Sequence, residues 1–475
     1  MPTEELRRPR LSLACWACML SLAGCAVPAD PPPHAVNPPA SWQGDGAQAD
    51  ASAPAFDAHW WRHFGSSELD ALIAQAEAHN QDLARALARV KGARAQARIA
   101  GAQLLPELTG QVDASREARL GGRAEVDGNE SMAGFAARYE LDLWGRQDAL
   151  HREARQGMRA SVFERDAVRI GVAAEVASSW LQRAGLRERA AIARHSLENA
   201  QRVLRLVESR GRAGAAAPLE LAQQRGLVAM RERELARLRQ EARNAETALA
   251  LLLGLPAPEP VAAEVRLDAV QVPAISAGLP SRLLVRRPDI AQAEARLAAA
   301  NANVQAARAA LLPRVTLSAS IGVQGQAPGA LFDNPLYSLA AGLAAPIFDG
   351  GRLAGARDLA EARREELLGA YRGAVIAAFA DAQTALHAVA GIDAQALAHA
   401  GELREARRAA ELSELRYKAG AETLLVLLDA QRVLYAAQDL EIQLRQARLQ
   451  ARVALYRALG GGWRDDGRVL AQGER

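Results

Sequence analysis

The sequence predicts a mainly α-helical fold that also carries transmembrane β-strands and is built from two copies of one plan. Three observations predict it: long proline-free stretches rich in Ala and Leu, runs in which apolar and polar residues alternate, and a repeat at an offset of about 206–207 residues. Half of the 475 residues are apolar but only 4% are aromatic, a composition that favours closely packed helices.

Residues 1–24 are predicted to form a signal peptide. Three arginines, Arg7, Arg8 and Arg10, precede a short apolar segment, Leu11–Ala23, which is too short to span a bilayer as a helix. The segment ends in Leu22-Ala23-Gly24-Cys25, which resembles a bacterial lipobox, where cleavage precedes an acylated cysteine. We therefore expect Cys25 to carry lipid; the alternative is an ordinary signal peptide with an incidental cysteine.

Several functional classes are disfavoured. All three cysteines lie within the first 25 residues, so no downstream disulfide framework is expected. The net charge of +3, with acids and bases well mixed, provides no basic stripe for nucleic acid. No catalytic motif or phosphate-binding loop is present, so we expect neither an enzyme nor a cofactor. His59 and His63 have the i, i+4 spacing of metal ligands, but with Trp60-Trp61 between them a structural role is expected and no metal site is predicted.

The mature chain is predicted to divide into a lipidated tether at 25–66, a first repeat at 67–255, a linker at 256–280, a second repeat at 281–460 and a tail at 461–475. The tether is rich in Pro, Ala, Asp and Gly, which is typical of an extended segment. The repeat appears in matching pairs: Asp82-Leu83 and Asp289-Ile290, Leu104-Leu105-Pro106 and Leu311-Leu312-Pro313, Ala213-Gly214 and Ala419-Gly420, Leu253-Gly254 and Leu459-Gly460. Each copy should contain a helix, two strands, a long helix, a turn and a returning helix.

The strands are predicted after Pro106 and Pro313, with partners at Ala133–Leu143 and Tyr337–Ile347. Apolar residues alternate with small or polar ones, and each run has about the length that a tilted strand needs to cross a bilayer. A half-buried sheet of a soluble domain would show the same alternation. Four strands are too few to close a barrel, so strands that span the membrane must be joined by strands of other protomers.

The long helices follow the strand pairs. A helix from Arg352 to about Leu415 would span roughly 95 Å, too long for a compact domain. Apolar residues recur along it at spacings of three and four, which predicts a seam for helix packing, and most charged residues are expected on solvated faces. Gly214 with Pro218, and Gly420, mark the hairpin turns.

The chain resembles the TolC/OprM-type outer membrane factors, specifically the NodT-like efflux outer-membrane lipoproteins. The most specific matching stretches are Tyr139–Arg146, Leu279–Ile290, Ala309–Pro313, Pro346–Arg352 and Asp429–Arg432. The resemblance implies a homotrimer with one twelve-stranded outer-membrane barrel, four strands per protomer, continued by a long periplasmic α-helical barrel. It also implies two partners, a periplasmic adaptor protein and an inner-membrane pump of the RND type.

In that family the helix tips close the periplasmic end and meet the adaptor, which implies roles for residues 210–221 and 416–428. Gly214 and Gly420 fall at the tip glycines, and Asp429 falls at an acidic position lining the aperture. Glu220 and Tyr417 match partners in the network that holds the tips together. Glu422 stands where the best-known member has an arginine, and Val426 replaces a second gate acid. Asp429 could instead be an ordinary solvated helix residue.

The resulting hypothesis is an outer-membrane channel subunit of a tripartite efflux system, lipid-anchored in the cell outer membrane and extending into the periplasm. It would act as a passive exit duct for solutes. The alternatives are the exit duct of a type I protein secretion system and a non-transporting coiled-coil periplasmic lipoprotein. The last of these would explain the long helices and the tether, but not the paired strands at matching points of both repeats.

Overall fold

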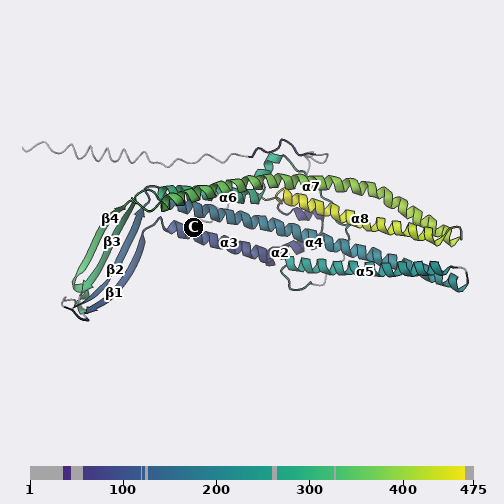
Figure 1. Cartoon of the computed structure of the whole chain (residues 1–475), viewed down its shortest axis with the longest axis horizontal. Coiled ribbons are helices and arrows are strands. Elements are labelled where there is room, and N and C mark those ends of the chain that lie inside the picture. Colours follow the sequence, from purple (N-terminus) through teal and green to yellow (C-terminus); the bar gives the residue numbers. More distant parts are fainter. Residues whose placement is uncertain are drawn as a thin grey trace, which may run out of the picture. The chain divides into compact units, whose positions relative to one another are not determined.

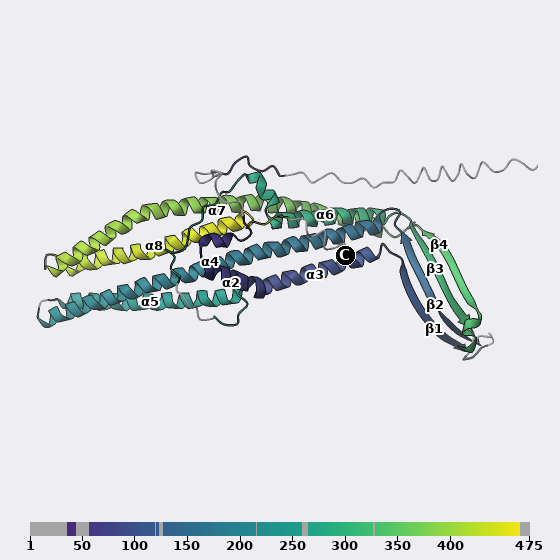
Figure 2. The same cartoon turned by 180° about the vertical axis from the view of Figure 1, so that it is seen from behind.

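The computed structural model describes residues 36–43, 57–118, 120–122, 127–214, 216–258, 265–325 and 328–465. The predicted signal peptide and the predicted lipid site Cys25 lie outside these residues. Figures 1 and 2 show the elements from two opposite sides.

The main helices of the first repeat recur in the second with equal lengths. The first half comprises η1 (Trp60–Phe64), α2 (Ser67–His79), α3 (Gln81–Ala102), β1 (Glu107–Ala118), β2 (Asp127–Leu141), α4 (Arg146–Arg212) and α5 (Pro218–Leu252). The second half comprises η2 (Pro280–Val285), α6 (Pro288–Ala309), β3 (Arg314–Gly325), η3 (Pro328–Asp333), β4 (Pro335–Ala344), α7 (Arg352–Lys418) and α8 (Leu424–Ala458). Helices α3 and α6 each have 22 residues, α4 and α7 each have 67, and α5 and α8 each have 35. The predicted duplication is confirmed.

The strands β2 and β4 end earlier than the sequence pattern indicated, at Leu141 and Ala344, and each is followed by a carboxylate that caps the next helix. Asp142 accepts hydrogen bonds from the backbone N–H groups of Gln147 and Asp148, at 3.0 and 2.8 Å. Asp349 does the same for Gly351 and Leu353, both at 3.0 Å. Each cap satisfies N–H groups that the first helical turn leaves without partners, so α4 and α7 begin at a defined residue.

The chain forms two compact units. The first contains residues 90–161 and 292–372, and it includes an antiparallel sheet in the order β1-β2-β3-β4. The second contains residues 36–89, 162–291 and 373–465, and it is helical apart from loops. Helices α4 and α7 contribute residues to both units.

The core of the second unit is an aromatic cluster around η1. Trp60 stacks on Tyr456 with ring centroids 5.0 Å apart, and Phe64 is fully buried beside them. His63 Nδ1 lies 3.0 Å from the Tyr456 hydroxyl, and burial raises the pKa of Tyr456 to about 12. His59 packs edge-on against Trp61. Both histidines therefore have structural contacts, and the described residues contain no group of side chains arranged for a metal ion.

Four helices pack in one order in the second unit. Helix α5 packs on α4 through a cluster that includes Leu186 and Leu238. Helix α4 contacts α8 through Arg189 and Asp439, and α8 packs on α7 through Ala437 and Leu403. The contacts thus run α5–α4–α8–α7, and both views show the α4/α5 pair beside the α7/α8 pair (Figures 1 and 2).

Candidate functional site

The register of the sheet gathers most of the apolar residues of the four strands on one face. Successive rows across the strands are Leu108–Ala137–Ala319–Leu339, Gly110–Phe135–Ile321–Tyr337 and Val112–Ala133–Val323–Pro335. Phe135, Ile321, Tyr337 and Leu339 are each at least 60% exposed. An exposed apolar face of this extent is unfavourable in water and matches the outer surface of a membrane barrel.

The opposite face of the sheet is mostly polar or small, with Met132 and Leu336 as exceptions. Ser320 lies 2.9 Å from Ser338 through their hydroxyl oxygens, and Thr109 donates to the carbonyl of Ala136. Gly134 and Gly322 oppose each other; a Cβ on Gly134 would lie 2.6 Å from the Ile321 carbonyl oxygen. Apolar-out and polar-in alternation is the arrangement of a water-filled barrel.

The Tyr139–Arg146 motif forms the junction between β2 and α4. The Arg146 guanidinium donates to both Glu140 carboxylate oxygens, with distances of 2.8 and 3.0 Å from Nη2. Trp144 Nε1 donates to the carbonyl of Pro313 at 2.6 Å, which joins this junction to the start of β3. Such bidentate pairing has a strict geometry, so it holds the strand and helix at a defined angle.

Each helix tip turns at a glycine in the left-handed conformation. Gly214 has φ +73° and Gly420 has φ +74°, a region that other residues adopt at a cost of roughly 1–2 kcal/mol. At the second tip, the N–H of Ala421 donates to the Arg416 carbonyl at 2.9 Å, which ends α7 sharply. Pro218 opens α5 at its first position, where a missing N–H costs nothing. Both turns lie where the sequence predicted them.

Tyr417 lies at the centre of the second tip. Its ring is buried with Val207 of α4 and with Leu424 and Leu427 of α8. Its hydroxyl oxygen is buried without a hydrogen-bond partner among the described residues. The Arg210 guanidinium lies 5.3 Å from the ring centroid, within the range of a cation–π contact. Tyr417 therefore ties the α4 tip to the α7/α8 tip.

The acidic candidates lie at separate points of the tips. Glu422 is 3.5 Å from the Arg416 guanidinium, across the Gly420 turn. Asp429 is exposed on α8 and pairs with Arg432 at 2.8 Å. Glu220 lies in the first turn of α5, at the other tip. The structure thus brings Tyr417 and Glu422 to one tip, while Asp429 points to solvent two residues beyond the buried Leu427.

The sequence did not predict roles for three arginines at the tips: Arg210, Arg416 and Arg432. Arg432 could have been found, because an i, i+3 pair with Asp429 is a regular helix contact. Arg416 and Glu422 are joined across a turn, and Arg210 meets Tyr417 from another helix. Such contacts depend on how the helices are rotated against each other, which residue spacing does not specify.

Comparison with known proteins identifies the class. The outer membrane efflux protein family matches residues 72–255 and 279–461, so the chain belongs to this family. It is an outer-membrane efflux channel subunit that extends into the periplasm, and its family is one of transport components. The fold class predicted from the sequence, in which each subunit of a trimer gives four strands and long helices, is confirmed as that of these channels.

Individual relatives cover nearly the whole chain. Pyoverdine export outer membrane protein OpmQ of Pseudomonas aeruginosa is 47% identical over 466 residues, which are 96% of this chain and 98% of the relative. Cation efflux system protein CusC of Escherichia coli K12 is 31% identical over 446 residues, 93% of this chain and 97% of the relative. A solved membrane protein from Pseudomonas aeruginosa superposes with a TM-score of 0.83 at 33% identity, covering 92% and 99% of the two chains.

Proposed function

We propose that three copies of the chain form the exit duct of a tripartite efflux system, completed by a periplasmic adaptor and an inner-membrane pump of the RND type. The observation that carries the proposal is the sheet: it has an exposed apolar face, and its outer strands β1 and β4 are both open edges. Unpaired backbone groups are not tolerated in lipid, so the edges must pair with those of other copies.

A direct experiment is reconstitution of the purified full-length chain in planar bilayers. We expect channels of uniform conductance. The same protein should migrate as a trimer on a semi-native gel and dissociate to monomers on heating. Protein that stays monomeric and does not conduct would contradict the duct and favour a non-transporting periplasmic lipoprotein.

The 47% identity to a pyoverdine export protein supports a cargo similar to pyoverdine, in preference to the metal cation of the 31% identical relative. Deleting the gene should trap such a cargo in the periplasm, and the wild-type chain should restore its release. Normal release from the deletion strain, with lowered tolerance of metal cations, would assign the duct to cation efflux instead.

The periplasmic gate is proposed to comprise Asp429, Glu220, Tyr417 and Glu422, with the adaptor meeting the tips around Gly214 and Gly420. The Tyr417 cluster supports this, because it links the two tips of one protomer through apolar packing and one cation–π contact. Arg416 gives Glu422 an attractive partner within the chain, so an acid at this position can still hold the tip together.

The membrane anchor is proposed to be lipid on Cys25, at the start of a tether that ends before the first repeat. Its support is the position of Cys25 after a short apolar segment. The end of the predicted tether is not all extended, since Trp60, Trp61 and Phe64 are buried in the helical unit. This packing holds the chain firmly just before the first repeat.

A further inference from the structure

Helix α3, which leads into strand β1, is strongly basic. It contains five bases and one acid, whereas its duplicate α6 contains two of each. Three of the bases, Lys91, Arg94 and Arg98, are spaced i, i+3 and i+7, so they lie along one side of the helix. All three are exposed. We call these three residues the α3 stripe.

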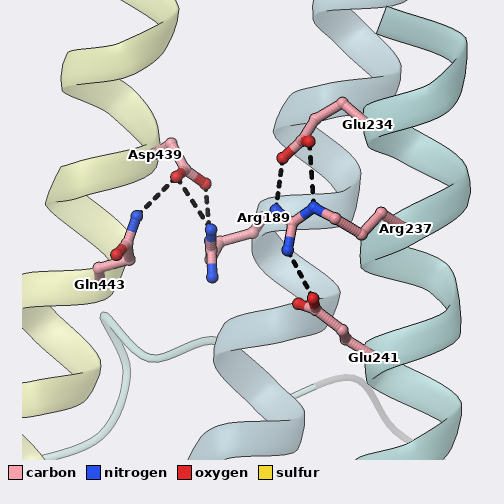
Figure 3. A network of polar contacts seen from close by, with 6 residues as sticks. All are labelled: Arg189, Glu234, Arg237, Glu241, Asp439 and Gln443. Atoms are coloured by element: carbon pink, nitrogen blue, oxygen red, sulfur yellow. Dashed lines mark hydrogen bonds and ion pairs between the residues drawn. The ribbon is translucent and has the colours of Figure 1, made fainter.

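The α3 stripe has no ion-pair partner in the part of the chain that the structure describes. Bases elsewhere on the long helices are paired: Arg189 with Asp439, and Arg237 with Glu234 and Glu241, as Figure 3 shows. Like charges three and four residues apart destabilise a helix, so a partner of opposite charge from outside the chain would relieve the repulsion within the stripe.

The duplicated helix shows that the fold does not require bases at these positions. At the offset of 207 residues, the equivalents of the stripe are Ala298, Asn301 and Gln305. They are only half-buried, although α6 has a helix on each side: Asn303 contacts α4 and Arg308 contacts α7. The corresponding side of α3 therefore stays accessible when α3 also has a helix on each side.

The sheet determines which side of α3 faces away from the lumen. The Gln324 N–H donates to the Asn334 carbonyl at 3.3 Å, so residues on the polar face of β3 direct their backbone groups toward β4. With that face toward the lumen, the chirality of L-residues places β1 to β4 in clockwise order when viewed from the end of the barrel remote from α3.

The stripe lies on the outward side of α3. This helix runs toward the viewer just defined and packs on α4, its clockwise neighbour, through the side that contains Ala97 and Gly101. A Cβ on Gly101 would lie 3.2 Å from His151 Nε2 of α4. At 100° per residue, the stripe is roughly a quarter turn counterclockwise from this packed side, which is the direction away from the lumen.

The outward side of α3 is continuous with the lipid-facing side of the sheet. Leu105 follows Arg98 by about two turns on the same side and is 67% exposed. Leu108 of β1 is 70% exposed and belongs to the apolar face. The bases thus end where the exposed leucines begin, which is the order expected where a helix meets a membrane surface.

The spacing of the stripe matches the polar layer of a bilayer. At 1.5 Å per residue, Arg98, Arg94 and Lys91 lie about 6, 12 and 16 Å from the end of α3 at Ala102. The headgroup layer of one leaflet is ~5–8 Å thick, so the long side chains of the two arginines can reach it. Lys91 lies about one Debye length from the layer, close enough to be attracted by its charge.

We propose that the α3 stripe binds the anionic headgroups of phospholipids in the periplasmic leaflet of the outer membrane. The contact sets the depth of the barrel, because the bases resist entry into hydrocarbon while the leucines above them resist leaving it. This inference goes beyond the proposed duct, since it requires only that the sheet spans the membrane.

Lipid retention by purified protein tests the contact. The full-length chain is reconstituted in vesicles of equal parts phosphatidylglycerol, which is anionic, and phosphatidylcholine, which is neutral overall. After extraction in mild detergent, the retained lipids are counted by mass spectrometry. One base near an anionic surface raises affinity about fivefold, so the wild type should retain phosphatidylglycerol in at least about fivefold excess at low salt. Changing all three stripe residues to Gln should bring the ratio near one, and Arg98→Gln should lower it more than Lys91→Gln.

The matched control removes three exposed bases from the helical unit that contains no strand: Arg239→Gln, Arg404→Gln and Arg408→Gln. It should keep the wild-type lipid ratio, so a loss confined to the stripe variant reports position and not total charge. Raising the salt concentration should lower the wild-type ratio, because salt screens the attraction between bases and headgroups.

The outcomes separate the lipid contact from the duct. Equal retention of both lipids by the wild type, or the same ratio in the wild type and the stripe variant, overturns the lipid contact. A stripe variant that keeps its lipid ratio but no longer binds purified peptidoglycan assigns the stripe to an anionic cell-wall polymer instead. Channel conductance is measured in parallel: a conducting stripe variant without lipid preference supports the contact, and a non-conducting wild type with lipid preference overturns the duct alone.

Discussion

Replacing Leu317 by arginine is expected to prevent stable insertion of the barrel. Leu317 lies on β3 between Tyr139 of β2 and Ala341 of β4, on the apolar face of the sheet. Its own row and the two rows next to it contain no carboxylate that could pair with a guanidinium, so the charge would have to face lipid.

The position along the strand sets the magnitude. Strand β3 runs from Arg314 to Gly325, which places Leu317 about two and a half residues from its middle. With a rise of ~3.4 Å per residue and a tilt of about 40°, this is roughly 6–7 Å from the bilayer midplane. Arginine costs about 2–4 kcal/mol at the midplane and less toward the interfaces, so we expect about 2 kcal/mol for each copy.

The assay is the yield of membrane-inserted trimer and its dissociation temperature on semi-native gels. The matched control is Ser320→Arg, which is nearer the strand middle but on the opposite face, beside Ala136 and Ser338. It should cost little if that face lines water. If Leu317→Arg inserts as well as the wild type, or if Ser320→Arg is equally damaging, the assignment of the two faces is wrong.

Two further predictions concern the anchor and the helical unit. Cys25→Ser should abolish labelling by radioactive palmitate; undiminished labelling would refute the lipid site. Burial alone would raise the pKa of Asp393, but hydrogen bonds from Arg452 and Arg448 outweigh it and hold that pKa below its usual value. The stability that this carboxylate contributes is therefore present above pH ~4 and lost as pH falls through the lowered pKa. Asp393→Asn should lower the free energy of unfolding by about 1–2 kcal/mol near pH 7 and make that free energy less dependent on pH in the acid range. Thermal unfolding followed by circular dichroism measures both effects. Unchanged acid sensitivity in the variant would assign that sensitivity to other carboxylates.

Local sequence patterns were sufficient to predict the secondary-structure elements of the fold. Alternation after Pro106 and Pro313 predicted β1 and β3, and the paired glycines Gly214 and Gly420 predicted the turns. These features depend on residues close in sequence, since a period of two or a positive φ is a property of a short segment. The 206-residue offset supplied long-range information, because each element predicted in one copy had to have an equivalent in the other.

The contacts between helices could not be predicted in the same way. The charged residues of the long helices were expected to form solvated faces, yet the half-buried Arg189 and the buried Arg452 both pair with carboxylates of neighbouring helices. Their partners are 250 and 59 residues away in the chain. Which charge meets which depends on the rotation of each helix, and that is set by the summed packing of its small side chains rather than by any one spacing.

The same limit applies to Asp429, whose role depends on neighbours in other copies. It shares a face of α8 with Leu425 and Val426, which are 64% and 44% exposed. Its pairing with Arg432 is between two largely exposed side chains, and such pairs contribute little stability. Asp429 is thus held loosely and can face a pore that the copies form together.

Asp429→Asn protein in planar bilayers should therefore lose cation selectivity and block by trivalent cations, because three clustered carboxylates attract and bind such ions while three amides do not. Arg432→Gln serves as the matched control: removing the compensating base should strengthen selectivity and block. The two variants must move in opposite directions if Asp429 lines the aperture. If both variants leave selectivity and block at wild-type values, Asp429 is a solvated helix residue, and the constriction has to be formed by other groups, with Glu220 and Glu422 the next to substitute.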